Sequence, residues 1–145
     1  MLAKRPDVEI VYPVHPNPNV RDPVNRLLKN NPAIHLIEPL GYVSFLDLVR
    51  RAYLVLTDSG GLQEEAPSFG KPVLVLRERT ERPEAVDAGT AELAGNTDCG
   101  RIVRAAARLL DNPQEYERRS AVHNPYGDGA SSGRISRAIL SFFER

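Results

Sequence analysis

Residues 53–76 read YLVLTDSGGLQEEAPSFGKPVLVL, and their pattern gives the clearest indication of the fold class. A short apolar run ends abruptly in Asp-Ser-Gly-Gly, a helix-like segment with two adjacent glutamates follows, and a second apolar run begins after Gly70. Two short apolar runs on either side of a helical segment are typical of parallel strands joined by a crossover helix. The stretch therefore predicts a strand–helix–strand unit with glycines, a hydroxyl and carboxylates close to the turn after its first strand.

The same alternation of apolar runs and amphipathic segments extends over the rest of the chain. Strands are predicted over residues 8–14, 33–39, 53–57, 71–76 and 90–95, and helices over 20–30, 44–52, 61–70, 97–112, 113–122 and 134–145. Ser44 is predicted to cap its helix. Apolar strands that alternate with helices predict an α/β fold, with a parallel sheet covered on both faces. Sheets of this kind bind ligands at the carboxyl ends of their strands.

Composition excludes several classes of function. The chain has 145 residues, enough for one domain, with 19 Lys and Arg against 19 Asp and Glu. A net charge of zero argues against a nucleic-acid or membrane partner held by bulk charge. The one cysteine, Cys99, can form no internal disulfide and no thiolate metal site, which fits a reducing cytoplasm. No apolar run approaches the roughly 20 residues that a membrane helix needs. We therefore expect a cytoplasmic protein without a metal or a cofactor.

The turn at residues 58–61 is the first candidate site. The start of a helix offers unpaired backbone N–H groups and the positive end of the helix dipole, and glycines let that backbone approach an anion closely. Ser59 can cap the helix or donate its hydroxyl to a phosphate oxygen. Glu65 lies one turn along and can accept hydrogen bonds from sugar hydroxyls. The alternative interpretation is an ordinary tight turn with a capped helix and solvated glutamates.

Other candidates follow neighbouring strands. Arg77, Arg79 and Arg82 come just after the strand at residues 71–76, where a guanidinium suits bidentate recognition of phosphate. Surface salt bridges are the alternative for these arginines. Phe45 can stack on a base at the same edge of the sheet, or it can pack in the core.

Three segments in the same order resemble one family over essentially the whole chain. VYPVHPNPNVRDPV, LTDSGGLQEEAPSFGKPVLVLRERTERPEAVDAGT and HNPYGDGASSGRI closely resemble the carboxyl-terminal half of the non-hydrolysing UDP-N-acetylglucosamine 2-epimerases. The resemblance implies a single Rossmann-like, doubly wound domain over residues 1–145, one half of a glycosyltransferase-B type fold. It also implies a role in cell envelope polysaccharide biosynthesis.

The resemblance carries specific roles onto this sequence. It implies that Ser59, Gly60 and Gly61 hold the diphosphate of a UDP-sugar, that Glu65 binds the ribose, that Arg82 contacts the phosphate region and that Phe45 lies beside the uracil. Leu40 departs from a glutamine of some members, which puts one uracil contact in doubt. His15 matches a histidine that in some members binds a second, activating UDP-sugar; the alternative is a structural histidine between proline-rigid turns.

The resemblance also implies an incomplete enzyme. The family inverts the 2-position of the sugar by eliminating and re-adding UDP, with catalytic groups in segments that this chain does not contain. We therefore expect no catalytic residue and no turnover in this chain, which begins like the tail of a helix and lacks an amino-terminal domain. The alternatives are a glycosyltransferase nucleotide-sugar domain and a non-catalytic UDP-binding module. The apolar final helix, whose usual partner would be that domain, predicts self-association or packing onto its own domain.

Overall fold

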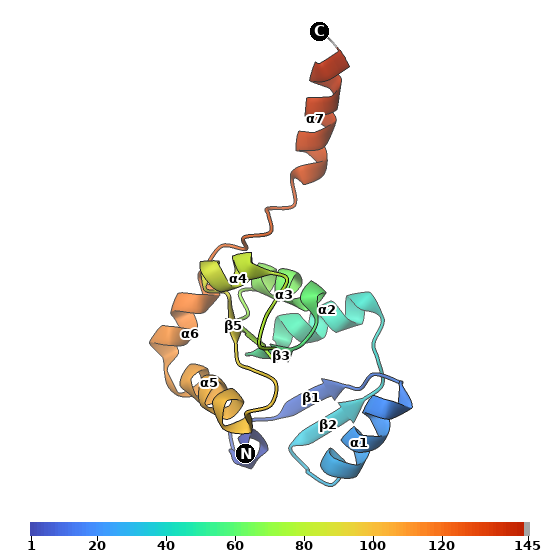
Figure 1. Cartoon of the computed structure of the whole chain (residues 1–145), viewed down its shortest axis with the longest axis vertical. Coiled ribbons are helices and arrows are strands. Elements are labelled where there is room, and N and C mark those ends of the chain that lie inside the picture. Colours follow the sequence, from blue (N-terminus) through green and yellow to red (C-terminus); the bar gives the residue numbers. More distant parts are fainter. Residues whose placement is uncertain (144–145) are drawn as a thin grey trace.

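The computed structural model describes residues 1–143 and has an α/β architecture in which strands and helices alternate (Figure 1). The strands are β1 (Ile10–Pro13), β2 (Ile34–Ile37), β3 (Val55–Thr57), β4 (Val73–Val75) and β5 (Ala91–Leu93). The helices are η1 (Leu2–Lys4), α1 (Pro18–Leu28), α2 (Tyr42–Arg51), α3 (Gly60–Glu65), η2 (Ala66–Phe69), α4 (Pro83–Ala88), α5 (Cys99–Asp111), α6 (Pro113–Ser120) and α7 (Ser131–Phe143). The predicted α/β class is confirmed.

All strand pairings are parallel, as expected, but they form two ladders. β1 pairs with β2, with Ile10 opposite Ile34. β4 lies between β3 and β5, so that Val73 is opposite Val55 on one side and Ala91 on the other. Within residues 1–143, no pairing joins β1 to β3. The predicted single sheet is therefore interrupted between these two strands.

The core is built around β4, whose side chains are buried on both faces. Val73 and Val75 belong to one cluster of buried apolar residues, and Leu74, between them, belongs to a second cluster with Leu109 of α5. Successive side chains of a strand point to opposite faces, so one buried strand supplies both clusters. The middle of the three-stranded ladder is thus the most firmly packed part of the fold.

Two helix boundaries differ from the sequence prediction for local reasons. α2 begins at Tyr42 with Gly41 as its N-cap, so the prediction that Ser44 caps this helix is wrong. The segment after β3 ends at Gly70 as predicted, with φ of 64°, but it divides into α3 and η2. Pro67 lies at this division, and because proline has no N–H it cannot continue the α-helical hydrogen bonding.

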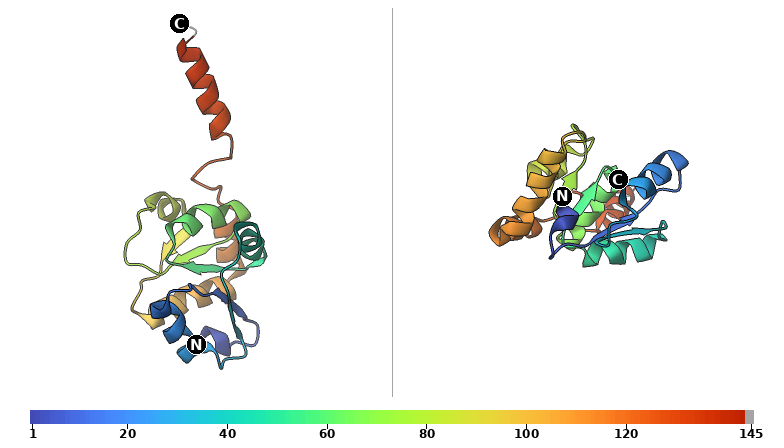
Figure 2. Two further views of the ribbon diagram at one scale, coloured as in Figure 1. Left: turned by 90° about the vertical axis from the view of Figure 1, so that its right-hand side faces the viewer. Right: turned by 90° about the horizontal axis from the view of Figure 1, so that it is seen from below.

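Helix α7 projects away from the rest of the molecule on an extended segment (Figures 1 and 2). Its residues are exposed throughout, including apolar side chains at Ile135, Ile139, Leu140, Phe142 and Phe143. Packing of this helix onto its own domain, one of the two expected outcomes, is therefore not what the structure has. None of the helices within residues 1–143 has both the length and the apolar character required to cross a bilayer.

Candidate functional site

The candidate site lies where β3 and β4 end and the chain enters α3 and α4. Thr57 ends β3, and its Oγ1 accepts a hydrogen bond of 3.0 Å from the backbone N–H of Ser59. Ser59 is the N-cap of α3, but its side chain makes no capping hydrogen bond, and the residue is exposed. Of the two roles considered for this hydroxyl, capping is therefore absent, and the hydroxyl is accessible to a ligand.

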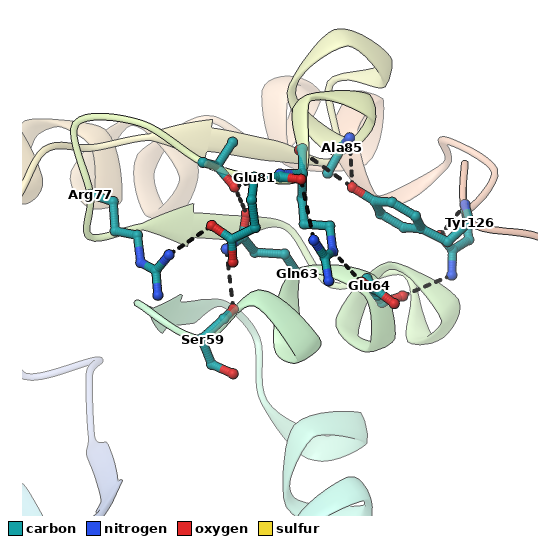
Figure 3. Close-up of polar contacts among 10 residues, drawn as sticks. Ser59, Gln63, Glu64, Arg77, Glu81, Ala85 and Tyr126 are labelled. Atoms are coloured by element: carbon teal, nitrogen blue, oxygen red, sulfur yellow. Dashed lines mark hydrogen bonds and ion pairs between the residues drawn. The ribbon is translucent and has the colours of Figure 1, made fainter.

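Gly60 lies directly against an acidic side chain from the neighbouring loop. A Cβ at Gly60 would be 2.5 Å from Glu81 Oε1, so a larger residue there would displace this carboxylate. Glu81 is held by an ion pair of 2.8 Å from Arg77 Nη1 (Figure 3). The positive end of α3 thus already faces a carboxylate, which is the kind of group that a helix start favours.

Gln63 connects the two loops and is one of the site residues that were not predicted from the sequence. Its side chain is fully buried, donates from Nε2 to the Ser59 carbonyl at 3.2 Å and accepts at Oε1 from the Thr80 hydroxyl at 2.6 Å. Thr80 Oγ1 in turn accepts from the Arg82 N–H at 3.0 Å. The only sequence signal was a polar residue four positions after Ser59, on the inward face of the helix.

The two adjacent glutamates have different partners. Glu64 forms an ion pair with Arg82, and this hydrogen bond raises the pKa of the Arg82 guanidinium further above its ordinary value. Glu65 accepts a hydrogen bond of 3.1 Å from the Tyr42 hydroxyl, which raises the pKa of that phenol. Glu64 therefore orients an arginine of the site, whereas Glu65 faces the start of α2.

The segment at residues 123–126 braces both loops from outside (Figure 3). The Tyr126 hydroxyl accepts from the Ala85 N–H at 3.1 Å and donates to the Arg82 carbonyl at 3.3 Å. Asn124 Nδ2 donates to the Glu64 carbonyl at 3.0 Å. Burial raises the pKa of the Tyr126 phenol. No role was predicted for these two side chains from the sequence.

The remaining predicted site residues lie at the periphery or elsewhere. A Cβ at Gly61 would lie 4.0 Å from Ser59 Oγ and would meet no closer atom, so this backbone is accessible. Phe45 packs against the core cluster that contains Val73 and Val75, the alternative considered for it, and its stacking on uracil stays a prediction. His15 follows β1, where its Nδ1 accepts from the Asn17 N–H at 3.1 Å. Among residues 1–143, no hydrogen bond or ion pair joins His15 to the site, and no side-chain cluster suited to a metal ion occurs.

The sequence matches the family model of UDP-N-acetylglucosamine 2-epimerase over residues 1–140. A UDP-N-acetylglucosamine 2-epimerase of Salmonella typhimurium is 57% identical over 142 residues. This match covers 98% of the present chain but 38% of the relative, so the chain spans little more than a third of that protein.

Solved structures give the same relationship. The Staphylococcus aureus MnaA–UDP structure has a TM-score of 0.91 at 46% identity, with 99% of this chain and 39% of that chain covered. The Neisseria meningitidis UDP-GlcNAc 2-epimerase bound to UDP-GlcNAc has a TM-score of 0.85 at 47% identity, with 95% and 38% covered. The glycosyltransferase-B-like architecture expected for these residues is thus confirmed.

Proposed function

This chain belongs to the UDP-N-acetylglucosamine 2-epimerase family, and we propose that it is a single UDP-binding domain of such an enzyme. In this proposal it holds the UDP part of UDP-N-acetylglucosamine, and segments outside the chain act on the sugar. The observation that carries the proposal is the turn after β3, where an accessible serine hydroxyl and two glycines open a helix beside Arg77 and Arg82.

The diphosphate is the natural ligand for this turn. Backbone N–H groups at the start of α3 and the Ser59 hydroxyl can donate to phosphate oxygens, and an arginine can bind two of them at once. The ion pair with Glu64 orients the Arg82 guanidinium, and the hydrogen bond from the Tyr126 hydroxyl to the Arg82 carbonyl holds the backbone of this residue. A guanidinium that is already oriented loses less conformational entropy when it binds an anion.

Other residues are assigned to the ribose and the uracil of the nucleotide. Glu65 can accept hydrogen bonds from the ribose hydroxyls in exchange for the one it now receives from Tyr42. Phe45, on helix α2, supplies an aromatic surface for uracil. We assign His15 to a second, regulatory UDP-sugar, because the described residues leave it outside the first site.

The family reaction gives this domain a defined chemical task. Elimination removes the proton at C2 and breaks the bond between C1 of the sugar and the UDP oxygen: the C–H electron pair forms a C1=C2 double bond, and the C–O electron pair leaves with UDP. Re-addition returns UDP to C1 and a proton to the opposite face of C2. Donors at the diphosphate stabilise the leaving group as charge develops on it. The proton transfers at the sugar need an acid and a base, which we place outside this chain. The 145-residue chain alone is therefore expected to bind UDP and to leave UDP-N-acetylglucosamine unchanged.

Calorimetry with UDP tests the binding proposal. Arg82→Ala should weaken binding about tenfold to a hundredfold, because it removes a charged hydrogen-bond donor, and Ser59→Ala should weaken it by a smaller factor. Arg137→Ala, in the exposed helix α7, is the matched control and should leave the affinity unchanged. Absence of UDP binding by the folded chain, or equal affinities for Arg82→Ala and Arg137→Ala, would contradict the proposal.

A further inference from the structure

The Glu81 carboxylate lies between two elements to which the proposed function assigns the diphosphate. Its Oε2 accepts a hydrogen bond of 2.8 Å from Arg77 Nη1 (Figure 3), and its Oε1 lies 2.5 Å from the position of a Cβ on Gly60. A guanidinium and the backbone of a glycine turn at a helix start are both groups that bind phosphate oxygens. The chain therefore holds one of its own anions at the place where we put the anion of the ligand.

The backbone of the loop that carries Glu81 is held in place, whereas the Glu81 side chain can move. On one side of it, Thr80 Oγ1 donates to Gln63 at 2.6 Å and accepts from the Arg82 N–H at 3.0 Å. Arg82 Nη1 also donates to the Glu81 carbonyl at 3.2 Å. The Glu81 side chain is 49% exposed, and exposed side chains change rotamer rapidly. Rotation of this side chain alone would therefore uncover the turn and release Arg77, with no rearrangement of the loop.

Breaking the Arg77–Glu81 ion pair costs little free energy. Both side chains are partly exposed, and an ion pair between exposed side chains contributes little because water solvates the separated charges. A diphosphate carries more negative charge than one carboxylate, and a guanidinium can donate to two of its oxygens at once. A phosphate group is therefore the stronger partner for Arg77, and the displaced carboxylate returns to water.

We propose that Glu81 is an internal stand-in for phosphate, which a phosphate group of UDP displaces from the turn at Gly60 and from Arg77. Arg77 then becomes a second phosphate-binding arginine beside Arg82. The inference rests on the proposed UDP site and adds two residues to it, one that competes with the ligand and one that this competitor holds ready. A ligand without phosphate leaves Glu81 in place, so the exchange favours nucleotides over nucleosides.

Calorimetry with UDP on four forms of the chain tests the exchange: the unmodified chain, Glu81→Gln, Arg77→Ala and the double variant. The stand-in lowers the apparent affinity, because only the fraction of molecules with a displaced Glu81 can bind phosphate. Glu81→Gln removes this competition and leaves Arg77 with no ion pair to break. Arg77→Ala should therefore cost about two- to fivefold more affinity in the Glu81→Gln background than in the unmodified chain, which is the range of an exposed ion pair.

Two results of this cycle would overturn the exchange. If the ion pair stays intact when UDP binds, each single variant weakens binding and the double variant is no weaker than either. If the pair takes no part in binding, Arg77→Ala costs the same affinity in both backgrounds. UDP binding that Arg82→Ala weakens would stand in both cases, so the proposed function fails only if that loss is absent as well.

Two controls separate the exchange from an effect of bulk charge. Arg79→Ala removes the same charge from an exposed position of the same loop, and its effect should be equal with and without Glu81→Gln. Uridine has no phosphate, so Glu81→Gln should leave its affinity unchanged. Equal coupling of both arginines to Glu81, or equal tightening for uridine and UDP, would overturn the proposal. Circular dichroism checks that each variant folds, and Arg77→Gln takes the place of Arg77→Ala if that variant does not.

Discussion

The Thr80 hydroxyl donates a 2.6 Å hydrogen bond to the buried carbonyl oxygen of Gln63 and thereby fastens the loop after β4 to the helix after β3. The same amide donates to the Ser59 carbonyl, and the same hydroxyl accepts from the Arg82 N–H. One buried side chain therefore sets the position of both Ser59 and Arg82. The two halves of the proposed diphosphate site are positioned by a residue that need not touch the ligand.

Gln63→Ala should destabilise the fold and weaken UDP binding together. It leaves the Ser59 carbonyl and the Thr80 hydroxyl without their buried partner, which costs about 1–3 kcal/mol in the free energy of unfolding. Urea denaturation measures the stability and calorimetry the affinity. Gln114→Ala, at an exposed position of α6, should change neither quantity. Stability equal to that of the Gln114 variant would contradict a structural role for the amide.

Tyr126→Phe should weaken the brace on α4 without creating a cavity. The change removes the acceptor of the Ala85 N–H and the donor to the Arg82 carbonyl, worth about 1 kcal/mol of unfolding free energy. We expect a lower urea midpoint and a several-fold weaker affinity for UDP. Tyr12→Phe is the matched control, since that residue is exposed on β1. An unchanged midpoint for Tyr126→Phe would show that its ring, not its hydroxyl, holds the segment.

Protonation of Glu115 in acid should lower the free energy of unfolding. Hydrogen bonds from Arg118 and then Arg119 lower its pKa from 4.5 to about 2, and the Arg119 side chain is only 9% exposed. Because the folded pKa lies below the unfolded one, this stabilisation is complete above pH 4.5 and is lost as the pH falls toward 2. Glu115→Gln should therefore lower the free energy of unfolding at pH 7 by more than at pH 3.

The control for this titration is Glu117→Gln, an exposed position of the same helix. Its difference from the unmodified chain should be small at both pH values. Urea denaturation at several pH values between 2 and 7 provides the comparison. A difference for Glu115→Gln that grows as the pH falls would have the wrong sign and would exclude the ion pairs as its cause.

Glu81→Gln should tighten the binding of UDP. The carboxylate lies against Gly60, at the helix start to which we assign the diphosphate, and two anions at one helix start repel each other. Neutralising the side chain is expected to increase the affinity about two- to fivefold, in line with typical helix-dipole energies. Glu78→Gln, in the same loop but paired with Arg101, is the control. Weaker binding by Glu81→Gln would mean that the Arg77–Glu81 pair supports the site.

Much of the fold was predictable because it follows from apolar runs and glycine positions. The alternation of strands and helices and the helix end at Gly70 could be predicted from residues alone. The interruption between β1 and β3 could not, because periodicity identifies strands but not their neighbours. Ser44 was a plausible cap by residue type, yet the helix begins earlier at Tyr42.

Only the candidate residues at the strand ends could be predicted from the sequence, and the residues that hold them in place could not. The Ser59–Gly61 turn and Arg82 lie at adjacent strand ends, as parallel topology requires. Gln63, Asn124 and Tyr126 were missed because their roles depend on contacts between distant segments, such as the hydrogen bond between Tyr126 and Ala85. The alternative interpretation of the glutamates was that they are solvated, whereas Glu64 forms an ion pair with Arg82.

The exposed helix α7 leads us to expect that the chain self-associates in a concentration-dependent way. It has 13 residues and no described packing partner, and isolated helices of this length are marginal in water. Its apolar side chains, from Ile139 at 52% to Phe143 at 80% exposed, form a surface that water solvates poorly. We therefore expect self-association through α7 at high concentration and loss of its helicity on dilution.

Sedimentation and circular dichroism over a dilution series, together with a chain ending at Gly129, test this expectation. The shortened chain should sediment as a monomer at every concentration and keep its remaining helices, because α7 contributes to neither core cluster. Phe142→Ser with Phe143→Ser should weaken the association of the full chain, since the two rings pack edge to face with centroids 5.5 Å apart and are exposed together. Arg137→Ala, on the same helix, leaves these side chains intact and should not weaken it. A full chain that stays monomeric with unchanged helicity would show that α7 is stable without a partner.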